Sequence, residues 1–428
     1  MLYCPFRKLF VSYKYIENSY IELFIVSVKV KACNMQAFLQ VGMREMEDRK
    51  TMVKVKRITT ELLDIPIKRP HQFSTQRVSS KSFVLLKMEL SNGIVGIGEG
   101  TTPGIWWNGE SVETMKLVID QYMTPLLIDE HVTYIEKSLQ RINRQVRANP
   151  FAKATVEMAL FDALGKLYNA PVHQLLGSLY QDKIPVRWAL ASGTEDGDIQ
   201  EAIDCVANNE YVNFKTKSGK EVPEEDAKRN LRLAEEIKGI SSIGIDPNGS
   251  WDRITTMKWM ESFYKAGIDF LEQPLAPRDI EGATMLVDMK KVPVMADESL
   301  ATVEDAFTLA KEKAANIFSL KVHKSGGMKN TIKIAGIAEA AGISCFGGTS
   351  LESSIGTAAC LHTVASIPNL DYGSEFFGPT WLADDLVKEP LILKEGFIHV
   401  PDMPGLGVEL DEEKVKKYRR KEQGEVIV

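Results

Sequence analysis

Five ionisable residues recur at nearly equal intervals in the second half of the chain, each at the end of a short apolar run. The steps between them are 29, 26, 25 and 24 residues. A strand, a loop and a helix occupy about that length in a (β/α)8 barrel, so each residue would lie at the same height on its strand. The series predicts a ring of charge at the carboxyl ends of the strands, where such barrels carry their active sites. Its members are Lys217, Asp246, Glu272, Asp297 and Lys321.

Alternating strand-like and helix-like segments support the same architecture. From Ile184 onward, short apolar runs alternate with helical patterns, which indicates parallel strands and crossover helices. Helices are expected over residues 223–238, 253–265, 279–290, 302–313, 328–341 and 353–365. Earlier in the chain, two strand-like segments precede three helical ones, which is typical of an α+β domain. These segments are 53–67 and 82–98, with a turn at 91–93, and then 110–127, 132–148 and 150–168.

We therefore predict an α/β protein with a TIM-like (β/α)7–8 barrel and an α+β N-terminal capping domain. The expected divisions are 52–180 for the capping domain, 184–380 for the catalytic barrel and 381–428 for a C-terminal segment that returns to the cap. Residues 1–51 are interpreted as a leader, disordered or resulting from a mis-assigned start, that adds nothing to the fold.

Composition excludes several classes of protein. The net charge of −6 argues against a nucleic-acid binder, because affinity for phosphate backbones comes from clustered Lys and Arg. The apolar stretch 20–30 is short and contains Glu22 and Lys29, which argues against a membrane span. Five scattered cysteines without a C-x-x-C indicate reduced thiols in a cytoplasmic protein.

Three carboxylates in the series point to a metal ion. Asp246, Glu272 and Asp297 would come from three neighbouring strands, with no His or Cys among them. Oxygen donors alone select a hard divalent cation, Mn²⁺ or Mg²⁺. The alternative, three separate salt bridges at the barrel rim, does not account for the even spacing.

Lysines flank this expected metal site. Lys215 and Lys217 stand two apart on one strand, so both side chains would point into the barrel mouth. Crowded ammonium groups lower the pKa of a lysine and allow it to act as a base. Lys321 would approach from the opposite side of the barrel. His323 is expected to pack rather than react, and Lys324 is assigned to the opposite face and to the following loop.

The charged motifs resemble those of a known family. The set K-T-K, I-D-P-N, L-E-Q-P, M-A-D-E-S and L-K-V-H-K-S-G-G is similar to that of the enolase superfamily, in its muconate-lactonizing subgroup. The stretches R-P-H-Q-F-S, P-G-I-W-W-N-G-E-S and G-S-E-F-F-G-P look more particularly like muconate and chloromuconate cycloisomerases. The resemblance implies that the three carboxylates bind the metal.

The resemblance also implies roles for the remaining candidates. Lys217 would be the general base at the α-carbon with Lys215 beside it, and Lys321 would act from the far side. Glu375 would be a proton donor. Cap loops around 69–76 and 101–109 would close over the substrate and supply the binding candidates, which are His71, Phe73, Trp106 and Trp107.

The activity implied is that of a metal-dependent isomerase of aromatic catabolism. It would convert cis,cis-muconate or a chloromuconate, a small dicarboxylate, into a lactone, and the resemblance implies a homo-oligomer, an octamer. Dipeptide epimerases, N-acylamino acid racemases and o-succinylbenzoate synthases remain alternatives. Aromatic residues follow Glu375, at Phe376 and Phe377, where an epimerase places a second acid, which favours a substrate without an amine. A catalytically silent barrel would be expected to have lost some of the charged residues, and all are present.

Overall fold

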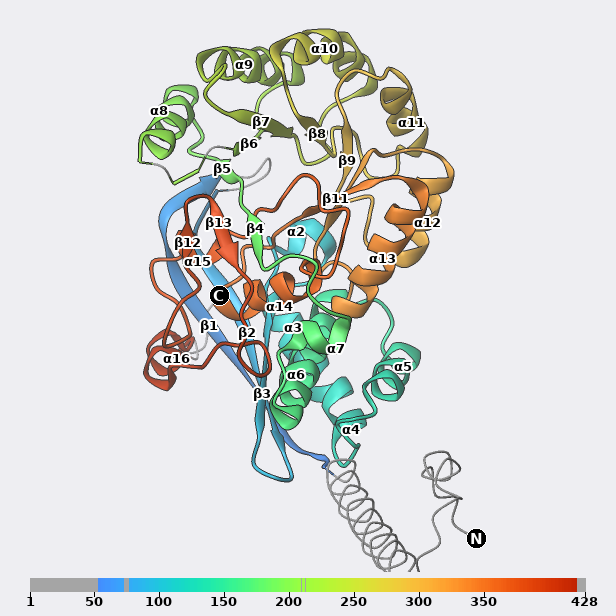
Figure 1. The fold of residues 1–428 in the computed structure, drawn as a ribbon, viewed down its shortest axis with the longest axis vertical. Coiled ribbons are helices and arrows are strands. Elements are labelled where there is room, and N and C mark those ends of the chain that lie inside the picture. The colour runs from blue at the N-terminus through green and yellow to red at the C-terminus, as the bar shows by residue number, and fades with distance from the viewer. Residues whose placement is uncertain (1–52, 73–76, 209, 212, 422–428) are drawn as a thin grey trace, which may run out of the picture. The chain divides into compact units, whose positions relative to one another are not determined.

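Three antiparallel strands form the first sheet of the protein (Figure 1). β1 (Val55–Gln72) pairs with β2 (Arg77–Leu90), and β2 pairs with β3 (Val95–Gly100). The computed structural model describes residues 53–72, 77–208, 210–211 and 213–421. The turn predicted at 91–93 lies between β2 and β3, so the segment 82–98 belongs to a hairpin. The first strand extends five residues beyond its expected end, with an irregularity between Pro66 and His71.

Helices follow these strands, as the sequence predicted. The helix expected over 110–127 is broken, because Pro125 has no N–H to donate to the preceding turn. A π-helical turn lies at the break. The elements are α2 (Ile105–Asn108), α3 (Val112–Val118), η3 (Ile119–Met123), α4 (Thr124–Leu127), α5 (Ile135–Gln145), α6 (Pro150–Tyr168) and α7 (Val172–Leu176).

Glycines allow β3 to lie directly against helix α6. A Cβ atom built on Gly96 or Gly98 would collide with the backbone carbonyl oxygen of Ala159 or Thr155, respectively. The glycine-rich stretch G-I-G-E-G is therefore a packing device between a strand and a helix. This close contact explains the glycines without any phosphate-binding role.

Seven parallel strands form the barrel, with neighbours in sequence order from β5 to β11. Ser374 closes it, because it bridges in parallel to Gly347 at one edge and to Val186 beside the other. The TIM-like barrel is thus confirmed. The strands are β5 (Trp188–Leu190), β6 (Asn213–Lys217), β7 (Ser242–Asp246), β8 (Phe270–Glu272), β9 (Val294–Ala296), β10 (Ile317–Leu320) and β11 (Ser344–Gly347).

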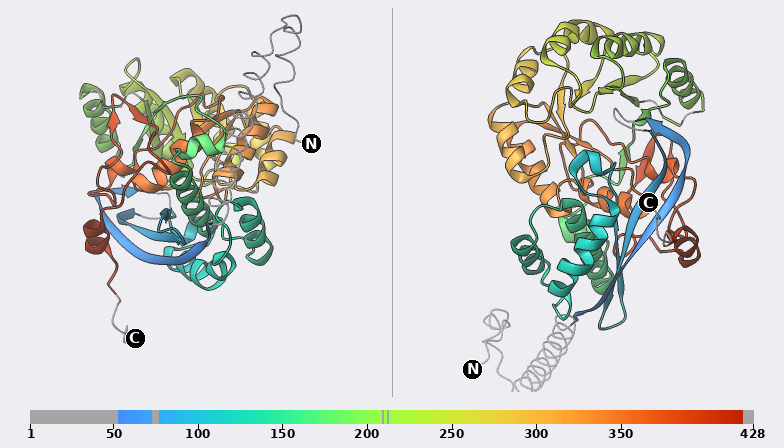
Figure 2. Two further views of the ribbon diagram at one scale, coloured as in Figure 1. Left: turned by 60° about the horizontal axis from the view of Figure 1, so that its bottom comes forward. Right: turned by 180° about the vertical axis from the view of Figure 1, so that it is seen from behind.

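Crossover helices surround the strands from outside in both Figure 1 and Figure 2. Helix α8 is an addition to those expected; Thr194 caps it and acidic residues fill its first turn. The helices are α8 (Glu195–Ala207), α9 (Pro223–Glu236), α10 (Arg253–Ala266), α11 (Ile280–Asp288), α12 (Val303–Lys311), α13 (Met328–Ala341) and α14 (Ser354–Val364). None of the helices in the described residues is long and apolar enough to cross a membrane.

The chain after the barrel returns to the first sheet. Leu382 bridges to Ile67 of β1, and Arg419 bridges to Leu63. A small sheet joins β4 (Lys183–Pro185) to the late hairpin. The late elements are α15 (Gly378–Trp381), β12 (Leu393–Lys394), β13 (Phe397–His399) and α16 (Glu412–Tyr418).

Inside the barrel, apolar side chains fill the space below the charged rim. Phe270, Met295, Ile317 and Phe346 form a fully buried cluster from four different strands, and Tyr372 packs against it. Because this layer fills the barrel below the rim, the charged residues of the described chain are reached from the side where the strands end and β1 and α2 lie.

Candidate active site

A cavity lies at the carboxyl ends of the strands. The barrel contributes both lysines that were expected to flank a substrate, Lys217 and Lys321, together with Glu375. The cap contributes His71 and Trp107. The other lining residues are Pro103, Ala189, Asn248, Thr349, Ser350, Leu351 and Phe377.

Lys215 lies beneath the cavity as the centre of a buried ion cluster. Its Nζ is 2.6 Å from Glu272 Oε2, 2.6 Å from Glu375 Oε2 and 3.3 Å from Asp246 Oδ2, and its side chain is inaccessible to solvent. Burial opposes its charge, but these carboxylates together raise its pKa well above the ordinary value. Crowding by a second ammonium group therefore does not lower the pKa of Lys215. Three carboxylates outweigh one neighbouring ammonium.

Lys217 lies at the surface of the cavity and pairs with Asp246. The two residues are register partners at the ends of β6 and β7, so strand pairing itself brings them together. Burial would raise the pKa of Asp246, but Lys217 and Lys215 hold it below its ordinary value. Lys217, unlike Lys215, is partly accessible and faces the space where a substrate could lie.

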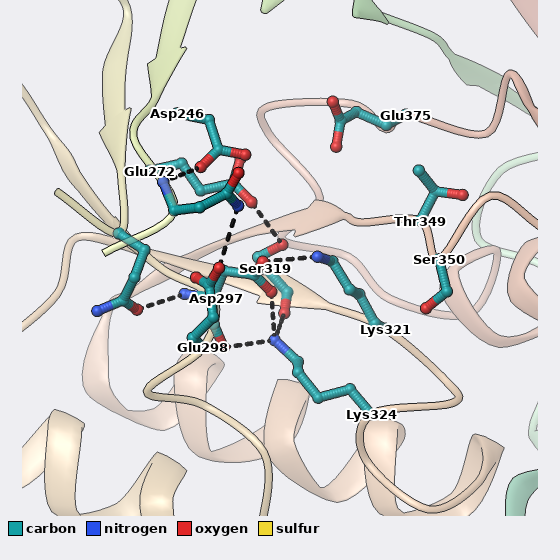
Figure 3. A network of polar contacts seen from close by, with 12 residues as sticks. Asp246, Glu272, Asp297, Glu298, Ser319, Lys321, Lys324, Thr349, Ser350 and Glu375 are labelled. Atoms are coloured by element: carbon teal, nitrogen blue, oxygen red, sulfur yellow. Dashed lines mark hydrogen bonds and ion pairs between the residues drawn. The ribbon is translucent and has the colours of Figure 1, made fainter. Parts of the chain in front are cut away.

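On the other side of the barrel two lysines share one carboxylate (Figure 3). Lys321 Nζ is 2.6 Å from Asp297 Oδ2, and Lys324 Nζ is 2.7 Å from Asp297 Oδ1. Lys324 also donates to the main-chain oxygens of Asp297 and Ser319. The assignment of Lys324 to the opposite face is wrong, because it is buried and holds Asp297 in place.

The three expected metal ligands lie at the ends of adjacent strands, and all are buried. Burial raises the pKa of Glu272 to about 8; Lys215 opposes this shift, whereas Asp246 and Asp297 add to it. Carboxylates that raise one another's pKa in this way favour added positive charge, and their oxygens are the donors that Mg²⁺ and Mn²⁺ prefer. The residues present therefore fit a hard divalent cation.

In this structure, lysine side chains form ion pairs with the three expected metal ligands. Within the described residues, no three His, Cys, Asp or Glu side chains already converge as the ligands of one metal ion. Each carboxylate is instead turned toward an ammonium group: Asp246 toward Lys217, Glu272 toward Lys215 and Asp297 toward Lys321.

Of the four binding candidates from the cap, two line the cavity. His71 is buried there, and burial together with nearby lysines holds its pKa well below the ordinary value, so the ring is neutral. The Trp107 ring lies 5.2 Å from Lys321 Nζ. Trp106 is not among the lining residues. Phe73 lies outside the described residues.

Sequence reasoning missed a buried polar network that ties the cap to the barrel. His323 Nε2 is 2.8 Å from the Glu99 main-chain oxygen, and its Nδ1 is 3.3 Å from Glu352 Oε1. The ring also stacks on Phe151, with centroids 5.8 Å apart, which confirms its expected packing role. Ser353 donates to the Glu99 carboxylate. These contacts fix the loop after β11 that carries Thr349 and Ser350.

The lining residues Thr349 and Ser350 could have been found from the same spacing. They follow the end of β11 at Gly347, which is 26 residues beyond Lys321. Because neither residue is ionisable, the series of charges did not include them.

Comparison with known proteins matches both halves of the chain. Residues 57–177 match the mandelate racemase / muconate lactonizing enzyme N-terminal domain, and residues 198–414 match the family described as enolase C-terminal domain-like. Muconate cycloisomerase 1 of Rhodococcus opacus is 38% identical over 86% of this chain and all of its own length. A chloromuconate cycloisomerase of Cupriavidus necator is also 38% identical, with the same coverage.

Solved structures agree in fold. The muconate lactonizing enzyme of Pseudomonas fluorescens, crystallised with muconolactone, superposes with a TM-score of 0.85 at 37% identity, covering 86% of this chain and all of that one. The 2-chloromuconate cycloisomerase of Rhodococcus opacus 1CP gives 0.84 at 38% identity, with the same coverage. The chain belongs to the enolase superfamily, among the muconate and chloromuconate cycloisomerases of its mandelate racemase and muconate lactonizing branch.

Proposed function

We propose that the protein is a muconate cycloisomerase that interconverts cis,cis-muconate, or a chlorinated muconate, with its lactone. The observation that carries the proposal is the placement of Lys217 and Lys321 in the lining of one cavity, above a cluster of buried carboxylates. The relatives with 38% identity over their full length are muconate and chloromuconate cycloisomerases.

The reaction requires a proton to move at one carbon. In the lactone-forming direction, one substrate carboxylate oxygen adds to the carbon β to the other carboxylate, and the α-carbon takes up a proton. We assign that proton to Lys217, because it faces the cavity while Lys215 is buried and held by Glu272 and Glu375. In the reverse direction Lys217 removes the proton.

The remaining polar residues stabilise charge. Lys321 lies beside the cavity with a raised pKa, because burial is outweighed by Asp297 and Glu272, so it stays charged. A fixed ammonium stabilises negative charge that develops on the substrate carboxylate. Glu375 lines the cavity, and we keep it as a proton donor in the proposed mechanism.

The metal belongs to the same proposal. Enzymes of this family use a divalent metal, and we assign it to Asp246, Glu272 and Asp297, with Mn²⁺ or Mg²⁺ as the ion. When bound, it would supply positive charge to the oxygens of the substrate carboxylate. We further propose a cytoplasmic homo-oligomer in which residues 52–180 act as the capping domain.

A turnover screen tests the proposed function. Muconate, chloromuconates, N-acyl amino acids and dipeptides are offered to the protein with Mn²⁺. Loss of the ultraviolet absorbance of the conjugated diene is expected with muconate or a chloromuconate. The dipeptides and N-acyl amino acids, followed by optical rotation, are expected to remain unchanged. Racemisation of an N-acyl amino acid with no loss of muconate would contradict the proposal.

A further inference from the structure

Ser350 lines the cavity, and the residue is 1% exposed. Its Oγ has no hydrogen-bond partner within the described part of the chain. Buried hydroxyl groups are nearly always hydrogen-bonded, because leaving one unsatisfied costs free energy. An unsatisfied donor in the wall of a substrate cavity indicates that the bound molecule supplies the acceptor.

The local structure holds this hydroxyl in place. The Ser350 N–H donates to Glu352 Oε1 at 2.8 Å, which fixes the backbone from beneath. The neighbouring Thr349 hydroxyl donates to the same carboxylate and accepts the Leu351 N–H, so it is already engaged. Of this pair of hydroxyls, Ser350 is the one available to a ligand.

The loop runs against Ser319 and Lys321. A Cβ atom on Gly348 would lie 2.7 Å from Lys321 Cε, so the glycine permits this close approach. In Figure 3, Thr349 and Ser350 stand apart from Asp297, with Lys321 between them. A substrate with one carboxylate near Lys217 and Lys321 would therefore extend its other end toward Ser350.

We propose that Ser350 Oγ donates a hydrogen bond to the second carboxylate of a linear dicarboxylate, the one that closes the lactone ring. This inference rests on the proposed function. The hydroxyl would hold one oxygen of that carboxylate and leave the other free to add to the carbon.

The step balances without any change in Ser350. A C–O bond forms as the carbon–carbon π pair moves toward the first carboxylate, and the α-carbon takes the proton from Lys217. The oxygen held by Ser350 becomes the carbonyl oxygen of the lactone. Ser350 is thus a specificity residue that distinguishes dicarboxylates from monocarboxylates.

Binding of two unreactive acids tests this inference. Adipate has two carboxylates and hexanoate has one, on chains of the same length. With Mn²⁺ present, calorimetry is expected to show that Ser350→Ala weakens adipate binding by about tenfold, as for a lost hydrogen bond to a charged group. Hexanoate affinity is expected to stay the same. The matched control is Ser366→Ala, a half-buried serine outside the cavity whose hydroxyl donates to Thr363 O.

The outcomes separate this inference from the proposed function. Unchanged adipate affinity in Ser350→Ala, or an equal loss for both acids, would overturn the role of Ser350, even if the native protein lactonises muconate. If muconate is not turned over but the adipate preference depends on Ser350, the dicarboxylate site stands and the proposed reaction fails.

Discussion

Replacing Lys217 with alanine is expected to abolish lactone opening together with exchange of the α-proton. Lys217 faces the cavity, whereas Lys215 is buried and held by three carboxylates, so Lys215 cannot take over the proton. A positioned acid or base contributes roughly 10²–10⁴-fold to rate. We expect a loss of that size, measured by lactone turnover and by deuterium exchange followed with NMR.

Two other lysines provide comparison variants. Lys220→Ala removes an exposed charge three residues further along, outside the lining of the cavity, and is expected to leave turnover unchanged. Lys321→Ala is expected to raise the activation free energy of turnover by about 2–4 kcal/mol, as for other groups that stabilise developing charge. Exchange of the α-proton on the Lys217 side is expected to continue. Exchange that persists in Lys217→Ala and disappears in Lys321→Ala would reverse the two roles.

Replacing Glu272 with glutamine is expected to eliminate activity while the fold remains. The change keeps the size of the side chain but removes one of the three anions assigned to the metal. Removing a residue that only hydrogen-bonds to a metal ligand typically lowers metal affinity by roughly 10–100-fold. Because Glu272 is itself an expected ligand, we expect a larger loss. Mn²⁺ affinity by calorimetry, turnover and the unfolding temperature together measure the effect.

A buried glutamate in the cap gives the matched control. Glu110 Oε1 accepts the Phe151 N–H at 3.1 Å and Oε2 accepts the Ala152 N–H at 3.2 Å, so glutamine keeps one of these two hydrogen bonds and none of the expected metal ligands is changed. Glu110→Gln is expected to bind Mn²⁺ normally. Normal turnover and Mn²⁺ affinity in Glu272→Gln would refute the metal assignment.

Spacing along the sequence was enough to predict the strand ends and the charges they carry. In a parallel barrel, equal steps place residues at equal heights, and pairing of Lys217 with Asp246 across β6 and β7 shows this directly. The crossover helices of the barrel were also predicted, apart from α8, whose signal is its capping residue Thr194 with a weak apolar pattern interrupted by Gly197.

The error at Lys324 has a physical cause. Alternation of faces holds only within a strand, and β10 ends at Leu320. The chain then turns, with the Ser325 N–H donating to the Lys321 carbonyl, so Lys324 points back toward Asp297. Turn geometry after a strand end is not encoded in residue spacing.

Other features depend on contacts between distant parts of the chain. The Glu99 main-chain carbonyl contacts His323, which is 224 residues away in the sequence. No local sequence pattern predicts this contact. The sequence also does not show that the Thr349 hydroxyl is hydrogen-bonded to Glu352 while the Ser350 hydroxyl has no partner in the described residues.

The most direct test of the central claim is lactonisation of cis,cis-muconate in deuterium oxide with Mn²⁺, followed by NMR of the product. The account predicts muconolactone carrying a single deuterium at one of the two positions of its α-methylene carbon, because Lys217 delivers the proton from one side. Deuterium at both positions in equal amounts, or exchange without lactone formation, would contradict it.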